Sequence, residues 1–516
     1  YKSGIFRTIY DPTCGTGGML SESEKFILGQ NANANLALNG QEYNDESWAI
    51  CCSDMLIKDE DTSSIVLGDT LGDGKTRDGF ENKRFHYMLA NPPFGVEWKD
   101  QKTTVENEHK YFGAGLPAIN DGSLLFLQHM IAKMHSFEED DPDRPGSKIA
   151  IVFNGSPLFS GDAGSGPSNI RRWIIENDWL DTIVALPDQL FYNTGIYTYI
   201  WLVSNRKPEE RRGFVQLIDG TRFFRKMKKS LNNKRNEISD EQIDALTRLY
   251  GNYSDGETAD VVIDHKTGET ETRVVSRVFG NHEFGFLKVT VERPLRMNFQ
   301  ATPERIARLD EQTAFANLAT SKKRKDDKAA QREMAEGRAM QQAIRDLLAT
   351  MADQGRYMDR EVFDTALGKA AKKTSIKLAA PIKKAIFAAL GERDPNAEIC
   401  RDAKFRPEPD SELRDTENIP LPEGTPLPLP MAFGPDKPND ELVEAFRDTI
   451  DAYMAREVLP HISDAWVDYS KTKVGYEIAI NRHFYVYKPP RPLPDIEADI
   501  RQLEGEIADL LKGLLT

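Results

Sequence analysis

Cysteine is scarce in this chain. The four that occur, Cys14, Cys51, Cys52 and Cys400, have no spacing that suits a metal site. So few thiols argue against a disulfide-stapled secreted scaffold, and we expect a reduced, cytoplasmic setting. No run of about 18 apolar residues is present, so the sequence predicts no membrane-spanning helix and no membrane partner. None of the eight histidines lies in an H-E-x-x-H pattern, and we assign no metal.

Positive charge is also in short supply. The chain carries 67 Lys and Arg against 82 Asp and Glu, which gives a net charge of −15. Affinity for DNA depends largely on cations that neutralise phosphates, so an acidic chain repels a duplex on average. Either DNA is not the substrate, or a partner supplies much of the affinity for DNA.

The N-terminal part alternates short apolar runs with helical stretches such as 122–134. This alternation predicts an α/β fold, a doubly wound and mostly parallel sheet of the Rossmann-like type, over residues 1–230. Because the first residue is Tyr1 rather than methionine, we expect an N-terminal region to be missing. The expected strands are 6–10, 48–52, 64–67, 87–90, 148–153, 182–186 and 197–203.

A largely helical C-terminal region is expected after this domain. Residues 231–300 form a mixed segment with a hairpin at 261–275, and residues 301–400 have a helix-favouring composition. The many prolines of 401–440 predict an extended linker or surface arm. Residues 441–516 include a helix at 440–458 and end in a seam with coiled-coil spacing, which we interpret as partner-binding. The seam consists of Ile496, Ile500, Leu503, Ile507, Leu510 and Leu514.

A glycine-rich turn directly follows the first apolar run. Glycines between a strand and a helix let the backbone approach a nucleotide-sized ligand closely. Leu20 occupies the last glycine position of a G-x-G-x-x-G pattern, so dinucleotide binding is less favoured; an ordinary tight turn is the alternative. The turn is Asp11-Pro12-Thr13-Cys14-Gly15-Thr16-Gly17-Gly18.

Two acidic residues follow later apolar runs. Glu42 is placed to accept hydrogen bonds from ribose hydroxyls, as acidic residues after a second strand often do. Asp69 is placed to accept from the adenine amine of a cofactor. A solvated charge at Glu42 and a turn-forming role at Asp69 are the alternatives.

The most specific motif is Asn91-Pro92-Pro93-Phe94, at the end of the expected strand 87–90. An aromatic amine is a poor nucleophile because its lone pair is delocalised into the ring. The Asn91 side-chain oxygen and the Pro92 carbonyl can accept from both amine hydrogens and so favour a localised lone pair. Proline holds its own carbonyl in a fixed direction, and Phe94 can stack on a base flipped out of the duplex.

These motifs resemble those of the modification subunits (HsdM) of type I restriction-modification systems. Residues 11–18 are similar to the cofactor motif of that family and residues 91–94 to the catalytic motif of amino-methyltransferases, with Phe94 favouring adenine. Residues 186–196, 291–296 and 466–487 also resemble HsdM segments, whereas residues 320–440 match nothing we recognise.

The resemblance implies a site-specific adenine-N6 DNA methyltransferase that uses S-adenosylmethionine. It implies double-stranded DNA and a specificity subunit (HsdS) as partners, with two copies of this chain per HsdS, and a restriction subunit (HsdR) that can join them. Catalysis falls to Asn91, Pro92, Pro93 and Phe94. Cofactor binding falls to Asp11, Pro12, Thr13, Gly15, Thr16, Gly17, Gly18, Glu42 and Asp69.

Three alternatives remain open. The chain could be another amino-methyltransferase, acting on a cytosine amine, on RNA or on a protein glutamine. It could be a non-catalytic scaffold that keeps the fold. A dinucleotide-dependent oxidoreductase is the most distant. A basic stretch is either a phosphate-binding surface or, as we prefer here, a solvated helix face; its residues are Lys369, Lys372, Lys373, Lys377, Lys383 and Lys384.

Overall fold

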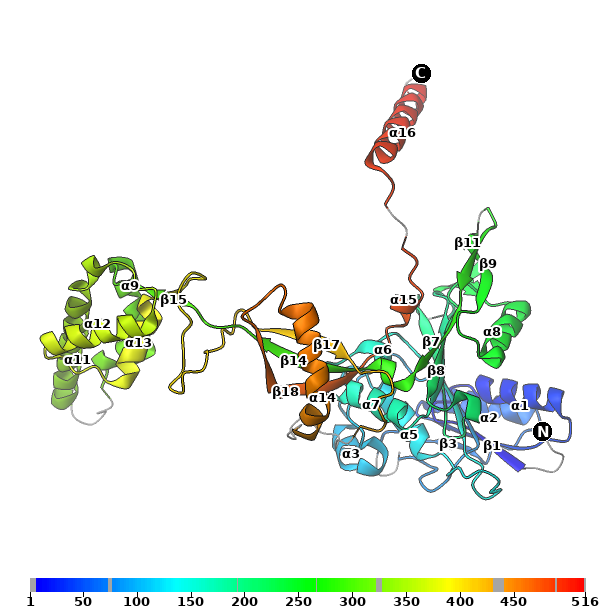
Figure 1. Cartoon of the computed structure of the whole chain (residues 1–516). Coiled ribbons are helices and arrows are strands. Elements are labelled where there is room, and N and C mark those ends of the chain that lie inside the picture. The colour runs from blue at the N-terminus through cyan, green and yellow to red at the C-terminus, as the bar shows by residue number, and fades with distance from the viewer. Residues whose placement is uncertain are drawn as a thin grey trace.

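A nine-stranded sheet forms the centre of the N-terminal domain (Figure 1). The computed structural model describes residues 6–72, 77–192, 194–265, 267–321, 327–429, 440–487 and 490–514. The strand order is β13-β8-β6-β7-β5-β4-β1-β2-β3. The strands are β1 (Phe6–Asp11), β2 (Asn35–Glu42), β3 (Ile65–Leu67), β4 (Tyr87–Ala90), β5 (Lys148–Phe153), β6 (Leu180–Leu186), β7 (Thr198–Ser204), β8 (Phe214–Asp219) and β13 (Ser276–Gly280).

The sheet is mostly parallel, which confirms the predicted fold class. Strands β1 to β5 run parallel to one another, and β6 runs parallel to β8. Only two strands reverse this direction: β7 is antiparallel to both β5 and β6, and β13 is antiparallel to β8. Parallel pairs need crossover helices, and these cover both faces of the sheet.

Alternate strand residues face two different sets of helices. Tyr10 packs in one core with α5 (Ser123–Ala132) and α7 (Gly166–Glu176). Its neighbour Ile9 packs on the opposite face with α1 (Gly18–Gln30) and α2 (Asp45–Ile57). The two-residue period of a strand therefore divides the buried residues between two layers of helix.

One expected strand, 48–52, is wrong, because these residues belong to α2. Asn44 caps this helix by accepting from the amide of Ser47, and Asp45 and Glu46 lie in its first turn, where acids are favoured. The true second strand, β2, was obscured by its buried polar residues. Gln41 is fully buried and donates to Thr70 Oγ1 at 2.9 Å, so it is compatible with the core.

The domain boundary expected at residue 230 is too early, since β13 forms an edge of the sheet. Between β8 and β13 the chain adds the hairpin of β9 (Arg225–Leu231) and β10 (Lys234–Glu237) and the helix α8 (Asp240–Asn252). The predicted hairpin at 261–275 is confirmed as β11 (Thr258–Asp264) and β12 (Glu269–Val274).

A second sheet joins distant parts of the chain in the order β17-β14-β18. Its strands are β14 (Gly285–Glu292), β17 (Asp415–Pro420) and β18 (Trp466–Tyr476), and α14 (Asp440–Tyr453) packs beside β18. The 401–440 segment is therefore not wholly a linker, because β17 lies within it; residues 430–439 fall outside the described part. Proline at the end of β17 is tolerated because β17 is an edge strand.

Residues 297–400, here called the helical unit, form a separate body with its own core. Phe299, Phe315, Leu348, Phe363 and Ile386 are fully buried in it. Figure 1 shows the unit set apart from the N-terminal domain. Its elements are β15 (Met297–Phe299), α9 (Pro303–Ala307), α10 (Thr313–Ala316), α11 (Asp327–Ala349), α12 (Arg360–Lys373), α13 (Ala380–Leu390) and β16 (Gly391–Arg393).

Two antiparallel stretches, 293–296 and 399–410, lead into and out of the helical unit; together they are called the stalk here. Backbone hydrogen bonds join them, for example from Leu295 N to Glu408 O at 2.8 Å and from Asp410 N to Arg293 O at 2.8 Å. Both ends of the stalk continue into neighbouring strands of the second sheet, β14 and β17. The helical unit is thus an insertion within that sheet.

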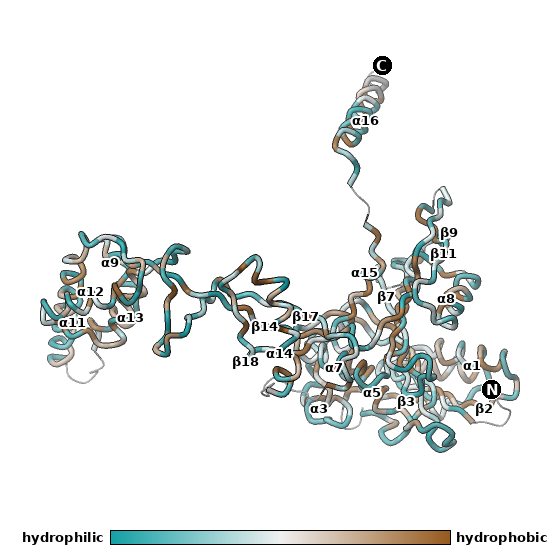
Figure 2. Tube along the Cα trace, in the orientation of Figure 1, coloured by the Kyte–Doolittle hydropathy of each residue, from teal (hydrophilic) through white to brown (hydrophobic). Residues whose placement is uncertain are grey.

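The C-terminal helix α16 (Leu493–Leu514) projects away from the remaining chain (Figure 1). The predicted seam lies on one helix, and its residues from Ile496 to Leu510 are exposed, with Ile500 at 51% and Leu510 at 71%; the side chain of Leu514 is outside the described part. Figure 2 shows hydrophobic and hydrophilic residues mixed along this helix. An amphipathic helix gains most of its stability from burying its apolar face, so this surface suits contact with another chain.

Candidate active site

The ends of four neighbouring strands bring the predicted motifs together. Asp11 ends β1, Glu42 ends β2, Asp69 follows β3 and Asn91 follows β4. These strands are parallel and adjacent in the order β4-β1-β2-β3, so all four residues lie at one carboxyl edge. Chain progression reverses direction between β1 and β4, and such a switch point is where open α/β sheets bind ligands.

The glycine-rich turn has a backbone that larger residues would disturb. Gly15 and Gly17 have φ values of 56° and 80°, in the left-handed region. A Cβ on Gly17 would lie 2.7 Å from Cys51 Sγ, so side-chain-free backbone is required there. Gly17 directly precedes α1, and the turn therefore presents a helix N-terminus at the carboxyl edge.

Asp11 is buried beneath this turn and holds its shape. Its Oδ1 accepts from the amide of Thr13 at 2.9 Å, and the side chain is 2% exposed. Burial raises the pKa of Asp11 to about 7, against the opposing effect of the hydrogen bonds from Thr13. A cation placed beside this carboxyl group would favour its ionised form.

Glu42 connects the turn to the end of β2. Its Oε2 accepts from the amide of Gly15 and its Oε1 from the amide of Asn44, both at 2.8 Å. Each carboxylate oxygen has a second lone pair for a ligand hydroxyl. The structure thus shows a loop-fixing role for Glu42 and places it beside the glycine turn.

Asp69 makes the contacts of a turn-forming residue, which is the alternative role considered for it above. Its Oδ1 accepts from the amide of Leu71 at 2.9 Å, and its Oδ2 accepts from Gln101 Nε2 at 2.8 Å. Thr70 donates to the Pro12 carbonyl at 2.6 Å, which joins this loop to the glycine turn. Asp69 lies at the carboxyl edge of the sheet, and both of its carboxylate oxygens already accept hydrogen bonds within the protein.

The Asn91–Phe94 motif stands at the surface of the same edge. Asn91 and Pro93 are exposed, Pro92 is buried and Phe94 is half-buried. The following loop is anchored by Trp98, whose Nε1 donates to the Ala118 carbonyl at 2.9 Å. The buried proline and this anchor hold the motif in place, while Asn91 is exposed to solvent.

A cavity of about 650 Å³ lies beside this motif and was missed at the level of sequence. It is bounded by Gly95 after β4 and by the segment that follows β5, including Ser156 and Ser160. Ser165 also lines it, and its buried Oγ has no hydrogen-bond partner among the described residues. The small-residue run 155–167 was the available signal, but isolated serines and glycines have many other uses.

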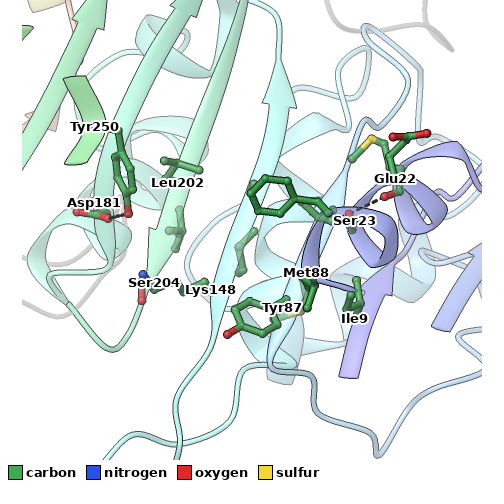
Figure 3. Close-up of a pocket in the computed structure, with 17 residues that line it drawn as sticks. Ile9, Glu22, Ser23, Tyr87, Met88, Lys148, Asp181, Leu202, Ser204 and Tyr250 are labelled. Atoms are coloured by element: carbon green, nitrogen blue, oxygen red, sulfur yellow. Dashed lines mark hydrogen bonds between the residues drawn. The ribbon is translucent and has the colours of Figure 1, made fainter. Parts of the chain in front are cut away.

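A second, mostly apolar cavity of about 500 Å³ contains none of the predicted residues (Figure 3). It lies on the sheet face that carries α1, over β1, β4, β5 and β7. Glu22 and Ser23 of α1 border one side, and Tyr250 of α8 borders the other, where its hydroxyl donates to Asp181 at 2.9 Å. This cavity marks a gap in the helical cover of that face.

Residues 186–196 follow β6 and lead into β7. Gln189 has a φ of 55°, and its carbonyl accepts from the amide of Arg235 at 2.9 Å, while Asn193 lies outside the described residues.

Across the described ranges, no three His, Cys, Asp or Glu side chains are arranged to hold a metal ion. In the same part of the chain, no helix combines the length and apolar character needed to cross a membrane.

Comparisons with known proteins identify relatives of this chain. The chain is 26% identical over 264 residues to the type I restriction enzyme MjaVII methylase subunit of Methanocaldococcus jannaschii, covering 50% of this chain and 42% of that relative. It is 31% identical over 213 residues to the HindI methylase subunit of Haemophilus influenzae, covering 41% and 44%. The chain spans less than half the length of these curated relatives.

Among solved structures, a type I restriction-modification methyltransferase subunit from Streptococcus thermophilus matches with 23% identity and a TM-score of 0.40. The match covers 49% of each chain. The family model described as N-6 DNA Methylase matches residues 4–269, more than half of the sequence and all four strand-end motifs. The chain therefore belongs to the N-6 DNA methylase family.

Proposed function

We propose that this chain is the methylating subunit of a type I restriction-modification enzyme and modifies the exocyclic amine of adenine in double-stranded DNA. The observation that carries this proposal is the position of Asn91-Pro92-Pro93-Phe94. The motif follows β4, the strand directly beside β1 and its glycine turn. Methyl donor and acceptor sites at adjacent strand ends satisfy the proximity that a direct displacement needs.

The residues around the glycine turn fit S-adenosylmethionine. Left-handed glycines leave space for an adenosyl group close to the backbone, and Glu42 lies beside them to accept from ribose hydroxyls. Asp11 is a buried carboxyl group suited to the cationic amino-acid portion. When bound, this cofactor supplies a methyl group activated by a positively charged sulfur.

The chain's own residues then hold the acceptor amine. Asn91 Oδ1 and the Pro92 carbonyl accept its two hydrogens and favour a lone pair directed at the methyl carbon. Phe94 stacks on the flipped base, and the cavity beside Gly95 and Ser156 has room for a base outside the duplex. The protein needs no covalent nucleophile for this step.

The proposal extends to partners. Relatives named as methylase subunits of type I restriction enzymes support a place in a multi-subunit enzyme. We propose that the complex contains a specificity subunit (HsdS) with two copies of this chain, and that a restriction subunit (HsdR) can join it. A net charge of −15 is consistent with base reading by another chain. The exposed seam of α16 is the surface we assign to partner contact.

The deciding experiment measures transfer of labelled methyl groups to DNA by the full-length protein, with and without its specificity subunit. Nuclease digestion then identifies the modified base. We expect N6-methyladenine in DNA only when the specificity subunit is present. Label in cytosine, RNA or protein instead would assign the chain to another class of amino-methyltransferase.

A further inference from the structure

Helices α12 and α13 carry a strongly basic surface. Residues 365–391 contain six lysines and neither Asp nor Glu. Lys383 pairs with Asp364 at 2.6 Å. The other five are exposed and form no ion pair with any residue that the structure describes. These five, called the lysine surface here, are Lys369, Lys372, Lys373, Lys377 and Lys384.

The charge of the helical unit contrasts with that of the remaining chain. The unit has 19 Lys and Arg against 15 Asp and Glu, a net charge of +4, so the other residues carry −19. Several of its arginines are neutralised internally: Arg305 and Arg308 pair with Glu392, and Arg345 pairs with Asp310. Lys328 and Arg338 of α11 are also exposed cations, but the lysine surface gathers five within sixteen residues, more densely than any other described part of the unit.

Helix stabilisation accounts for only part of this surface. Lys372 and Lys373 lie in the last turn of α12, where cations interact favourably with the helix dipole. Lys384 lies near the start of α13, where a cation is unfavourable and where the first turn has no acid. Lys377 lies between the two helices. Helix stabilisation therefore accounts for Lys372 and Lys373 but not for Lys377 or Lys384.

A groove of about 800 Å³ runs along α12, and part of the lysine surface lines it. Lys369 and Lys373, four residues apart on one side of the helix, line it together with Thr365. Asp359 and Glu361 line the opposite end, at the start of α12. An anionic ligand is therefore attracted to the C-terminal end of α12 and repelled from its N-terminal end.

We propose that the lysine surface binds the phosphate backbone of duplex DNA that flanks the methylated site. This inference rests on the proposed function, since it takes DNA as the substrate. Figure 1 places the helical unit across the stalk from the large sheet, so the bound stretch lies outside the segment that enters the active site. Lysine ammonium groups are point charges suited to phosphate rather than to base recognition, so the contact is independent of sequence.

The test uses the full chain assembled with its specificity subunit, with fluorescence anisotropy on labelled duplexes of two lengths, one too short to extend beyond the target site. The patch variant is Lys369→Gln/Lys372→Gln/Lys373→Gln. The matched control, Lys328→Gln/Arg332→Gln/Arg338→Gln, removes the same charge from exposed positions of α11 in the same unit. Loss of phosphate contacts lowers the slope of log affinity against log salt by about 0.9 per contact.

On the long duplex, we expect the slope of log affinity against log salt to be smaller in the patch variant than in the unmodified chain, by up to about 2.7. On the short duplex, and in the control variant on both duplexes, the slope should be unchanged. Equal slopes in patch variant and control would overturn the proposal while methylation of the short duplex still supported the proposed function. If neither the unmodified chain nor any variant methylated DNA, both the proposed function and the inference about the lysine surface would be wrong. If the triple variant does not fold, Lys377→Gln/Lys384→Gln provides the same comparison, with a smaller slope change.

Discussion

The N-terminal domain and the helical unit use their polar residues in different ways. In the domain, polar groups stand at the ends of parallel strands, and several are buried and hydrogen-bonded, such as Asp11 and Gln41. In the helical unit a mainly apolar core is surrounded by charge on the helix surfaces. The comparison teaches that polar residues fixed at a sheet edge define chemistry at single atoms, whereas charge spread over helices defines an electrostatic surface.

The largest expected effect separates the chemistry from everything else in the chain. Asn91→Ala should lower the methyl-transfer rate by about 10²–10³-fold, because one oriented polar group at the acceptor amine is removed. Asn91 is exposed, so the free energy of unfolding should change by less than about 0.5 kcal/mol. Single-turnover kinetics and cofactor titration measure the two effects. A variant with full activity would disprove the catalytic role.

A substitution in the other core tests whether the two regions are independent. Phe363 is fully buried, and its ring stacks on Phe299 at 4.9 Å. Phe363→Ala should cost the helical unit about 3–5 kcal/mol of stability, seen as faster hydrogen exchange in α11 to α13. Cofactor affinity should be unchanged. Phe405→Ala is the control, since that ring is 71% exposed.

If Phe363→Ala also weakened cofactor binding, the two cores would be coupled and the comparison would fail. If it changed neither exchange nor melting, the aromatic stack would contribute little to the helical unit. Hydrogen exchange in β1 to β5 provides an internal reference in the same sample, because those strands belong to the other core.

The smallest expected effect is a pH dependence of cofactor affinity. The pKa of Asp11 is raised to about 7 by burial, so the free protein holds a proton there as pH falls below that value. If the bound cofactor requires the carboxylate, its affinity should fall about tenfold from about pH 8 to about pH 6. Calorimetric titration at several pH values measures this dependence.

Two histidines of this domain do not titrate over the same range. Burial lowers the pKa of His129, beside the Tyr10 hydroxyl, to about 3, and that of half-buried His86, at the opposite end of β4 from Asn91, to about 4, so both stay neutral. Asp11→Asn should therefore bind cofactor weakly with a flat pH profile. A profile that still changed in this variant would assign the effect to a different residue.

The sequence predicts most of this sheet edge well because Asp11, Asp69 and Asn91 each follow a strand that is recognisable by itself. Asp11, Asn91 and the predicted order of motifs need only the rule that parallel strands end at one edge. Glu42 was identified, although its strand, β2, was not expected at 35–42, because Asn39 and Gln41 interrupt the apolar pattern. Their hydrogen bonds to distant residues are tertiary contacts that no local pattern reveals.

Other features depend on long-range pairing and were not predictable. The second sheet combines residues 285–292, 415–420 and 466–476, and no local pattern links these three strands. The cavity beside Ser156 and Ser165 exists only because the loops after β4 and β5 meet. The helices of the helical unit were predicted from composition, but their position as an insertion follows only from the pairing of β14 with β17.

The stalk has a mechanical consequence. A unit held by one chain can rotate about single bonds, but here two antiparallel stretches are joined by backbone hydrogen bonds, for example from Cys400 N to Leu295 O and from Leu295 N to Glu408 O. Two hydrogen-bonded stretches therefore constrain the orientation of the helical unit relative to the second sheet more than a single-chain linker of the same length would.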